Sequence, residues 1–245
     1  MATSDTRPET AEAQPLPERA RLLSRSFLFR GLAPDALEAV ARLTALRPLA
    51  AGETLFWQDD EADALYGVVE GLVRIWVHGP DGKELTLNLM EAGDFFGEIA
   101  LLDGLPRTAS ASALTDSRLL VLQRRDFLAL LERAPHLALH VIELLCERLR
   151  GNTDRLRDAA FLDLGTRLAK TLHALAIAHG QAESGGTLIQ AKLSQGNLAQ
   201  LLGVTREAVN KQLKAFEREG LLAQRGGRIL VPDLDALHAR GRAEG

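Results

Sequence analysis

The sequence predicts an α+β fold with three successive parts: a roll of short strands, one long helix, and a small C-terminal domain of helices and a hairpin. Two patterns indicate this. Between Leu49 and Val121, short apolar stretches alternate with glycines, which is typical of an all-β barrel or roll. From about Pro135 to Phe161, apolar residues recur at intervals of three and four, which is typical of a helix.

Length and composition fit a globular chain. At 245 residues the chain can form one large domain or two small ones, and 46% hydrophobic with 25% charged residues is close to the globular average. The sequence has no apolar run of about 20 residues and no basic-then-apolar leader at Met1, so we expect a cytoplasmic location. Cys146 is the single cysteine, which excludes an internal disulfide and an all-cysteine metal site; we expect it to be a small buried apolar group.

Charge is distributed unevenly along the chain. The net charge is −4, but the segment Lys192–Leu230 has seven basic residues against three acidic ones, a net charge of +4. A basic module on an acidic body is expected where one end of a protein binds a polyanion. An ordinary solvated helix face gives the same count, and charge alone favours that simpler interpretation.

The N-terminal 134 residues divide into a tail and a roll. Residues 1–20 are rich in proline, threonine and glutamate and predict a mobile tail, because they can bury little apolar surface. The roll domain is predicted over 21–134 and includes a helix that begins at Pro34 and continues through Leu43. Its strands are expected at residues 54–57, 64–69, 72–77, 85–89 and 117–122.

The long helix, predicted over 135–162, has a stripe of residues spaced as in a coiled-coil seam. A lone helix does not need such a stripe, and its symmetric partner is the same helix of a second chain, so we expect a homodimer. Asn152 is the one polar member and could fix the register as a buried amide. The stripe consists of Ile142, Leu145, Leu149, Asn152, Leu156 and Ala159.

Residues 163–240 predict a helix to about His179, a loop over 180–186, a strand over 187–190, two helices and a hairpin. The two helices have the outline of a helix-turn-helix: Ser194 and Thr205 can cap them, and Gly203 fits the turn. In the second helix the side chains of Val209, Leu213 and Phe216 should face the core. Those of Arg206, Glu207, Asn210 and Lys211 then face outward, as a DNA-recognition helix requires. A helix-turn-helix can also serve only as a packing unit.

A second informative stretch is Phe95–Ala109. Gly97 is followed by a short helical turn, whose backbone N–H groups can bind an anion. Arg107 can bind phosphate oxygens with paired hydrogen bonds, and Glu98 can accept a hydrogen bond from a hydroxyl. Phosphate and hydroxyl together indicate a nucleotide. The alternative is a structural ion pair between Glu98 and Arg107.

From about Leu28 to Leu230 the sequence resembles the cyclic-AMP receptor protein and fumarate–nitrate regulator family of bacterial transcription factors. The resemblance implies a double-stranded β-helix (jelly-roll-like) domain for a cyclic nucleotide, a dimerisation helix and a winged helix-turn-helix. It also implies that Glu98 accepts the ribose 2′-hydroxyl and Arg107 holds the cyclic phosphate. Further implied contacts are Gly97, Ile99, Ala100 and Thr108 at the phosphate, and Asn152 and Thr153 at the purine.

The sequence departs from the family pattern at the purine. The cyclic-AMP receptor protein usually has threonine and serine where this chain has Asn152 and Thr153, and Arg107-Thr108-Ala109 also occurs in cyclic-GMP-binding relatives. Cyclic AMP is therefore the expected effector, with cyclic GMP left open. A regulator that binds DNA without nucleotide, or that responds to another effector, is the alternative. A nucleotide-responsive regulatory subunit that controls a partner protein is a third.

By the same resemblance, Arg206, Glu207 and Lys211 contact bases. Arginine suits guanine and glutamate suits cytosine, whereas lysine lacks the guanidinium fork. Residues 222–231, turning at Gly226–Gly227, resemble a wing. The full set of implied DNA-binding residues is Ser194, Gln195, Thr205, Arg206, Glu207, Asn210, Lys211, Arg225 and Arg228.

The expected partners are a palindromic double-stranded operator, a second copy of the chain and RNA polymerase. We expect neither an enzyme, because no nucleophile–base pattern is present, nor a prosthetic group. No metal site is expected either, because His136 and His140 lack a third ligand.

Overall fold

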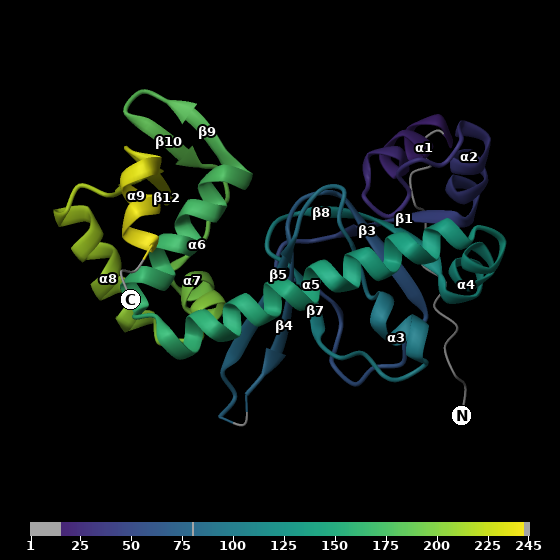
Figure 1. Ribbon diagram of the computed structural model, residues 1–245, viewed down its shortest axis with the longest axis horizontal. Coiled ribbons are helices and arrows are strands. Elements are labelled where there is room, and N and C mark those ends of the chain that lie inside the picture. The colour runs from purple at the N-terminus through teal and green to yellow at the C-terminus, as the bar shows by residue number, and fades with distance from the viewer. Residues whose placement is uncertain (1–15, 80, 243–245) are drawn as a thin grey trace. The chain divides into compact units, whose positions relative to one another are not determined.

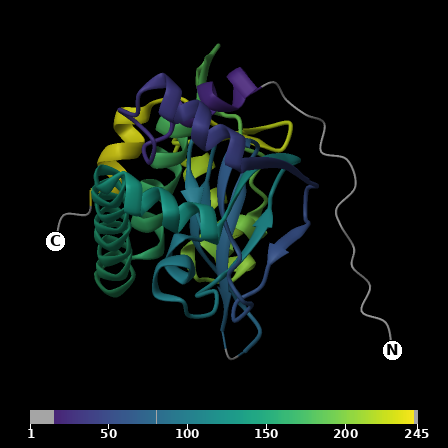
Figure 2. The same ribbon diagram turned by 90° about the vertical axis from the view of Figure 1, so that its right-hand side faces the viewer.

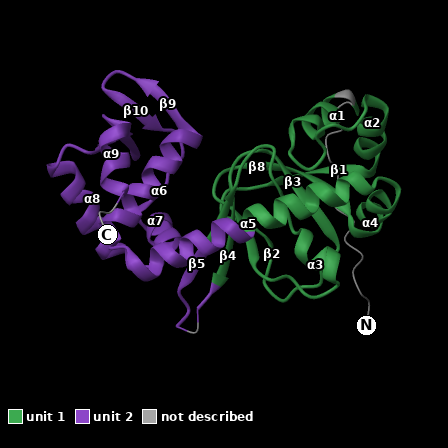
Figure 3. Cartoon of the chain, viewed as in Figure 1, with its two compact units in different colours: residues 1–77, 87–148 green, residues 78–86, 149–245 purple. Residues whose placement is uncertain are grey.

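The computed structural model describes residues 16–79 and 81–242 (Figure 1). The first helix, α1, spans Leu16–Arg25, so the last five residues of the segment expected to be a tail are helical; the rest of that segment lies outside the described residues. The chain divides into two compact units, residues 1–77 with 87–148 and residues 78–86 with 149–245 (Figure 3). Among the described residues, no helix is both long and apolar enough to cross a membrane.

The first unit is a roll of two four-stranded sheets, ordered β1-β8-β3-β6 and β2-β7-β4-β5. Its helices flank the sheets in Figures 1 and 2. The strands are β1 (Thr44–Leu49), β2 (Thr54–Phe56), β3 (Ala64–Glu70), β4 (Val73–His78), β5 (Glu84–Met90), β6 (Phe95–Phe96), β7 (Ser110–Ala113) and β8 (Ser117–Gln123). The helices after α1 are α2 (Pro34–Leu43), α3 (Glu98–Asp103), α4 (Arg124–Arg133) and the first part of α5 (Pro135–Phe161). The expected strands are present; β1, β6 and β7 were not predicted, nor was α4.

Two apolar clusters hold this unit together. One lies within the roll and includes Tyr66, Phe96 and Leu119. The other joins α1 and α2 to β3, β8 and the start of α5, where Leu137 and Val141 are buried. Burial of such side chains is the main favourable term in folding. It fixes the first turns of α5 on the roll, in a cluster that also includes Leu101 of α3.

The second unit contains the rest of α5, α6 (Leu164–His179), and a sheet ordered β11-β12-β10-β9. Residues 180–183 form the strand β9, paired with β10 (Gly186–Ile189), so the prediction of a loop over 180–186 was wrong there. The remaining elements are α7 (Gln195–Leu202), α8 (Arg206–Arg218), β11 (Ala223–Arg225), β12 (Arg228–Val231) and α9 (Leu234–Gly241).

The helix-turn-helix forms as its sequence signals predict. The Ser194 hydroxyl accepts a hydrogen bond from the backbone N–H of Asn197, whose side chain in turn accepts from the backbone N–H of Ser194, a capping box. Gly203 ends α7 with a φ of 65°, in the left-handed region that glycine adopts at low cost. The Thr205 hydroxyl accepts from the N–H of Ala208 and caps α8.

We expect Asp163→Ala to lower the free energy of unfolding by about 1 kcal/mol at pH 7, because Asp163 caps α6. Its carboxylate accepts hydrogen bonds from the backbone N–H and the hydroxyl of Thr166, and the backbone bond is the main reason that the pKa of Asp163 lies below its usual range. A depressed pKa stabilises the fold above the unfolded pKa of about 4, and this contribution is lost as pH falls through the folded pKa.

Urea unfolding at several pH values measures this effect. The difference in free energy of unfolding between the wild type and Asp163→Ala should become smaller in acid. Asp163→Asn, which keeps the cap, should show only a small deficit at pH 7; a deficit as large as that of Asp163→Ala would contradict this assignment.

Candidate functional site

The turn into α3 is built around a glycine. Gly97 follows β6 with a φ of 88° and caps α3. A Cβ atom at this position would lie 2.7 Å from Nη1 of Arg107, so a side chain here would displace the guanidinium. The turn thus brings the first backbone N–H groups of α3 beside Arg107, as an anion-binding turn requires.

Arg107 is buried, with 3% of its surface exposed. Its Nη1 donates to the carbonyl of Gly97 at 2.9 Å and its Nη2 to the carbonyl of Ala64 at 2.8 Å. The guanidinium lies 4.2 Å from the ring centroid of Phe56, and its nearest carboxylate oxygen is that of Asp63, at 3.5 Å. Burial lowers the pKa of Arg107. Apart from the exposed carboxylate of Asp63, the partners of this buried cation are neutral carbonyls, so the site can also accept an anion that balances its charge.

Glu98, the first residue of α3, is also buried, with 1% of its surface exposed. One carboxylate oxygen, Oε1, accepts a hydrogen bond from Nη1 of Arg148 on α5. Arg148 also donates to the carbonyl of Phe95. Glu98 therefore pairs with Arg148, and Arg107 is held by backbone carbonyls and Asp63, so the alternative of a structural Glu98–Arg107 ion pair is not what the structure shows.

Two buried polar atoms of this site have no hydrogen-bond partner among the described residues: Oε2 of Glu98 and Nε of Arg107. Leaving such groups unpaired costs free energy, so native proteins usually satisfy them. A free carboxylate oxygen suits a hydroxyl donor, and the buried guanidinium suits an anion. Side chains of these types fit one ligand that carries both groups.

The outward face of α8 is polar and the inward face is apolar. Val209, Leu213 and Phe216 are buried, as expected. Arg206, Glu207 and Lys211 are exposed and Asn210 is partly exposed. Lys211, Lys214, Glu217 and Arg218 line a shallow hollow on this helix. An apolar inner face with charged and amide groups outside is the arrangement of a recognition helix.

The hairpin that follows α8 has the shape of a wing. Strands β11 and β12 pair in antiparallel register and turn at Gly226 and Gly227, whose φ angles are 56° and 77°, as a two-residue hairpin turn requires. Arg225 is exposed, and Arg228 is partly exposed. Nη1 of Arg225 donates to the carbonyl of Ser184 at 3.2 Å.

Two family models match the chain: a cyclic nucleotide-binding domain over residues 46–134 and a Crp-like helix-turn-helix domain over residues 166–240. The chain is 33% identical to the CRP-like cAMP-activated global transcriptional regulator of Mycobacterium tuberculosis, over 90% of this chain and 99% of that protein. It belongs to the CRP/FNR family of transcription regulators.

Other relatives agree with this assignment. The chain is 36% identical to the cyclic AMP receptor protein of Thermus thermophilus, over 84% of this chain and 92% of that protein. Its fold matches the c-di-GMP responsive global regulator CLP of Xanthomonas campestris with a TM-score of 0.71 and 26% identity, over 87% of this chain and 99% of that one. These names attach different effectors to CRP/FNR proteins of similar fold.

The remaining residues that the sequence predicted for the nucleotide site lie at several points of the structure. Thr108 and Ile99 are exposed beside Arg107 and Glu98, and Ala100 is buried. Asn152 and Thr153 belong to the second unit, whereas the phosphate-site residues belong to the first. Both are exposed in the single chain: Oδ1 of Asn152 accepts from Arg155 at 2.8 Å, and the Thr153 hydroxyl donates to the carbonyl of Leu149 at 2.9 Å. Cys146 is exposed in the single chain, so the expectation that it is buried was wrong.

Sequence reasoning missed Arg148. It lies fifty residues after Glu98, on the long helix, and the helical pattern gives an arginine there no special weight. The one available signal is its position four residues before Asn152, which places both on one face of a helix.

Proposed function

We propose that the chain is a homodimeric transcription regulator whose affinity for a palindromic operator is controlled by a cyclic nucleotide, with cyclic AMP as the effector. The observation that carries this proposal is that one turn holds both a buried guanidinium, that of Arg107, and a buried carboxylate, that of Glu98, and that each has a polar atom without a hydrogen-bond partner among the described residues. The names of the Mycobacterium and Thermus relatives, both cyclic-AMP regulators, support cyclic AMP.

In this proposal Arg107 and the N–H groups of the turn at Gly97 bind the cyclic phosphate. Thr108, exposed next to Arg107, donates its hydroxyl to a phosphate oxygen. Oε2 of Glu98 accepts the hydrogen bond of the ribose 2′-hydroxyl, while Arg148 keeps Oε1 occupied. The nucleotide then satisfies both buried atoms that the protein leaves unpaired, and this gain contributes to its affinity.

Asn152 and Thr153 are proposed to contact the purine. An amide and a hydroxyl can each donate and accept a hydrogen bond, so these side chains can adapt to either purine. These two side chains are therefore compatible with both cyclic AMP and cyclic GMP, and the measured affinity for each nucleotide distinguishes between them.

The apolar stripe on α5 is the proposed dimer interface. Ile142, Leu149 and Leu156 are 55%, 67% and 73% exposed in the single chain, and they share one helix face with the spacing of a seam. Large apolar side chains exposed in a row mark an interaction surface, and the same helix of a second chain is its symmetric complement.

We expect Leu149→Glu to shift the chain from dimer to monomer. It would place two like charges in the seam without partners, which costs more than the loss of apolar contact alone. Light scattering coupled to size exclusion, at matched protein concentration, measures the mass. The control is Ile177→Glu, at an exposed apolar residue of α6. An unchanged dimer in the Leu149 variant would contradict the proposed interface.

On DNA, two α8 helices related by the dimer axis would enter successive major grooves, about 34 Å apart. Arg206, Glu207 and Lys211 are proposed to contact base edges, with Asn210 beside them. We propose that two groups of residues contact phosphates. The first lies at the starts of α7 and α8 and consists of Ser194, Gln195 and Thr205; the second consists of the wing residues Arg225 and Arg228. RNA polymerase is the expected further partner of such a regulator.

Titration calorimetry with cyclic AMP, cyclic GMP and cyclic di-GMP tests the nucleotide part of the proposal. The expected result is saturable binding of one cyclic mononucleotide per protomer. Binding of cyclic di-GMP alone would instead favour the behaviour named for the Xanthomonas regulator. If none of the three nucleotides gave a heat of binding, the nucleotide part of the proposal would be wrong. The chain would then be a DNA-binding regulator that does not respond to these nucleotides.

A further inference from the structure

We propose that Asp63 is a specificity-determining residue of the candidate phosphate site, and that its charge makes this site favour a cyclic phosphodiester over a phosphate monoester. An anion is expected at the site because the guanidinium of Arg107 is buried and its Nε has no hydrogen-bond partner among the described residues. The inference rests on the proposed function and deepens it. The residues that carry it all belong to the first unit.

The segment between β2 and β3, residues 57–63, is an acidic loop. It contains four carboxylates and no basic residue, so its net charge is −4. The carboxylate side chains belong to Asp59, Asp60, Glu61 and Asp63, and all four residues are exposed. A phosphate that binds next to this loop therefore approaches a concentration of negative charge.

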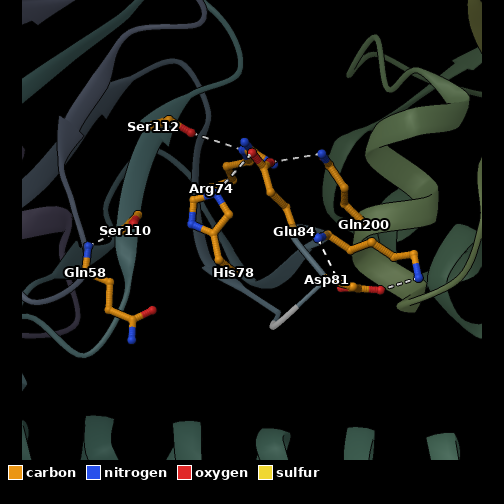
Figure 4. Close-up of polar contacts among 9 residues, drawn as sticks. Gln58, Arg74, His78, Asp81, Glu84, Ser110, Ser112 and Gln200 are labelled. Atoms are coloured by element: carbon orange, nitrogen blue, oxygen red, sulfur yellow. Dashed lines mark hydrogen bonds and ion pairs between the residues drawn. The ribbon is translucent and has the colours of Figure 1, made fainter.

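Backbone hydrogen bonds hold the acidic loop beside Arg107. The N–H of Asp59 donates to the carbonyl of Arg107, and the N–H of Arg107 donates to the carbonyl of Asp60, both at 2.8 Å. The N–H of Gln58 donates to the hydroxyl of Ser110 on β7 at 2.9 Å (Figure 4). The position of the loop next to Arg107 is thus set by the backbone and does not depend on the acidic side chains that point into solvent.

Within the loop, Asp63 is the residue whose carboxylate pairs with the guanidinium. Its Oδ1 lies 3.5 Å from Nη2 of Arg107, and its side chain is 73% exposed. The shorter hydrogen bonds of Arg107 go to the carbonyls of Gly97 and Ala64, at 2.9 and 2.8 Å. These carbonyls orient the guanidinium, so the contribution of Asp63 to the site is mainly its charge.

The same carboxylate acts with opposite sign on the guanidinium and on a phosphate bound to it. Burial lowers the pKa of Arg107, whereas the negative charges of Asp63, Glu98 and Asp60 are among the influences that raise it. A carboxylate close enough to stabilise the cation is also close enough to repel an anion that the cation binds.

This repulsion grows with the charge of the phosphate. A cyclic phosphodiester carries a single negative charge, whereas a phosphate monoester carries about 1.5 to 2 at neutral pH. At separations of about 4–6 Å in a water-like dielectric, repulsion between two unit charges lowers affinity by about three- to sixfold. The exposed side chain of Asp63 fits this dielectric. The energy doubles for a doubly charged phosphate, so the loss becomes about ten- to thirtyfold.

Discrimination by charge suits the proposed effector. Cyclic AMP and 5′-AMP, the product of its hydrolysis, share the base and the ribose and differ at the phosphate. Arg107 attracts both. Asp63 offsets this attraction more for 5′-AMP than for cyclic AMP, and so favours the cyclic nucleotide.

The experiment compares the wild-type full chain with Asp63→Asn, which keeps the size of the side chain and removes its charge. Competition of cyclic AMP and of 5′-AMP against a fluorescent cyclic-AMP analogue gives a Kd for each. We expect Asp63→Asn to bind cyclic AMP about three- to sixfold more tightly than the wild type, and 5′-AMP about ten- to thirtyfold more tightly. The preference for cyclic AMP over 5′-AMP should therefore fall by about three- to sixfold.

Three results would overturn the inference. A lower affinity for cyclic AMP in Asp63→Asn would show that Asp63 positions Arg107. Unchanged affinities would show that its charge does not reach the phosphate. Equal gains for the two nucleotides would show that it does not distinguish them by charge.

Glu61→Gln is the matched control. Glu61 is an exposed carboxylate of the same acidic loop, two residues before Asp63. We expect this substitution to change either Kd by less than about twofold. Gains equal to those of Asp63→Asn would show that the total charge of the loop, and not Asp63, sets the preference.

Salt gives a second readout, which a purely structural role of Asp63 would not change. Because dissolved ions screen charges, the difference between the wild type and Asp63→Asn should shrink between about 0.1 M and about 1 M salt. A difference of constant size would contradict an electrostatic role.

These measurements separate the inference from the proposed function. If neither protein binds a cyclic nucleotide, the proposed function is wrong and this inference fails with it. If the wild type binds cyclic AMP and Asp63→Asn binds it with the same affinity, the proposed function stands and this inference alone is wrong.

Discussion

Arg107→Ala is expected to reduce the affinity for cyclic AMP by about 100-fold or more while the dimer remains intact. The loss corresponds to two charge-assisted hydrogen bonds to phosphate, each contributing roughly 1.5–3 kcal/mol. Titration calorimetry measures the affinity, and light scattering confirms the dimer, whose proposed interface on α5 is separate from this side chain.

Arg107 also donates hydrogen bonds to two backbone carbonyls. Because Arg107→Ala removes these structural hydrogen bonds as well, two control variants are measured with it. Arg107→Lys keeps the positive charge but not the fork, and it should show an intermediate loss. Arg118→Ala removes an arginine of the same unit that pairs with Glu70, and its affinity should equal that of the wild type. Near-normal nucleotide affinity in a folded Arg107→Ala protein would show that the phosphate binds elsewhere.

Arg206→Ala is expected to reduce affinity for the selected operator by about 5- to 150-fold and to relax the preference at one base pair in each half-site. A bidentate arginine–guanine contact contributes about 1–3 kcal/mol of discrimination. Arg206 is the first residue of α8 and is exposed, and recognition helices contact base edges through their N-terminal residues. Fluorescence anisotropy with the operator and its single-base variants, at one salt concentration, measures both effects.

The control lies at the other end of the same helix. Arg218→Ala removes an exposed arginine from the last turn of α8. It should leave the base preference unchanged and weaken binding to all duplexes alike, through general electrostatics. If both variants lost affinity equally for every duplex, Arg206 would be a phosphate contact and not a base contact.

Where local signals determine structure, the sequence predicted it well. The bounds of α5, the capping of α7 and α8, and the burial of Val209, Leu213 and Phe216 all follow from periodicity and caps. The strand β9 was missed because its residues, Gly-Gln-Ala-Glu, include no large apolar side chain and are all exposed. It forms by pairing with the next strand, β10, at the edge of the sheet, and strand formation depends on such pairing more than on the residue types of the strand itself.

Some residues of the candidate site could likewise be predicted from local sequence, and others could not. Glu98 and Arg107 lie within one short motif, and the sequence indicated both. The hydrogen bond from Arg148 to Glu98 joins residues 50 positions apart, and one sequence contains no record of such distant pairs. The sequence also could not show that Arg107 is held by the carbonyls of Gly97 and Ala64, because that depends on how β3 lies beside the turn.

The most direct test of nucleotide-controlled DNA binding is the Kd of the unmodified full chain for its selected duplex, measured at one salt concentration with and without saturating cyclic AMP. The proposed function predicts an affinity about 5- to 150-fold higher with the nucleotide, the usual range of allosteric coupling. Equal affinities in the two conditions would contradict it.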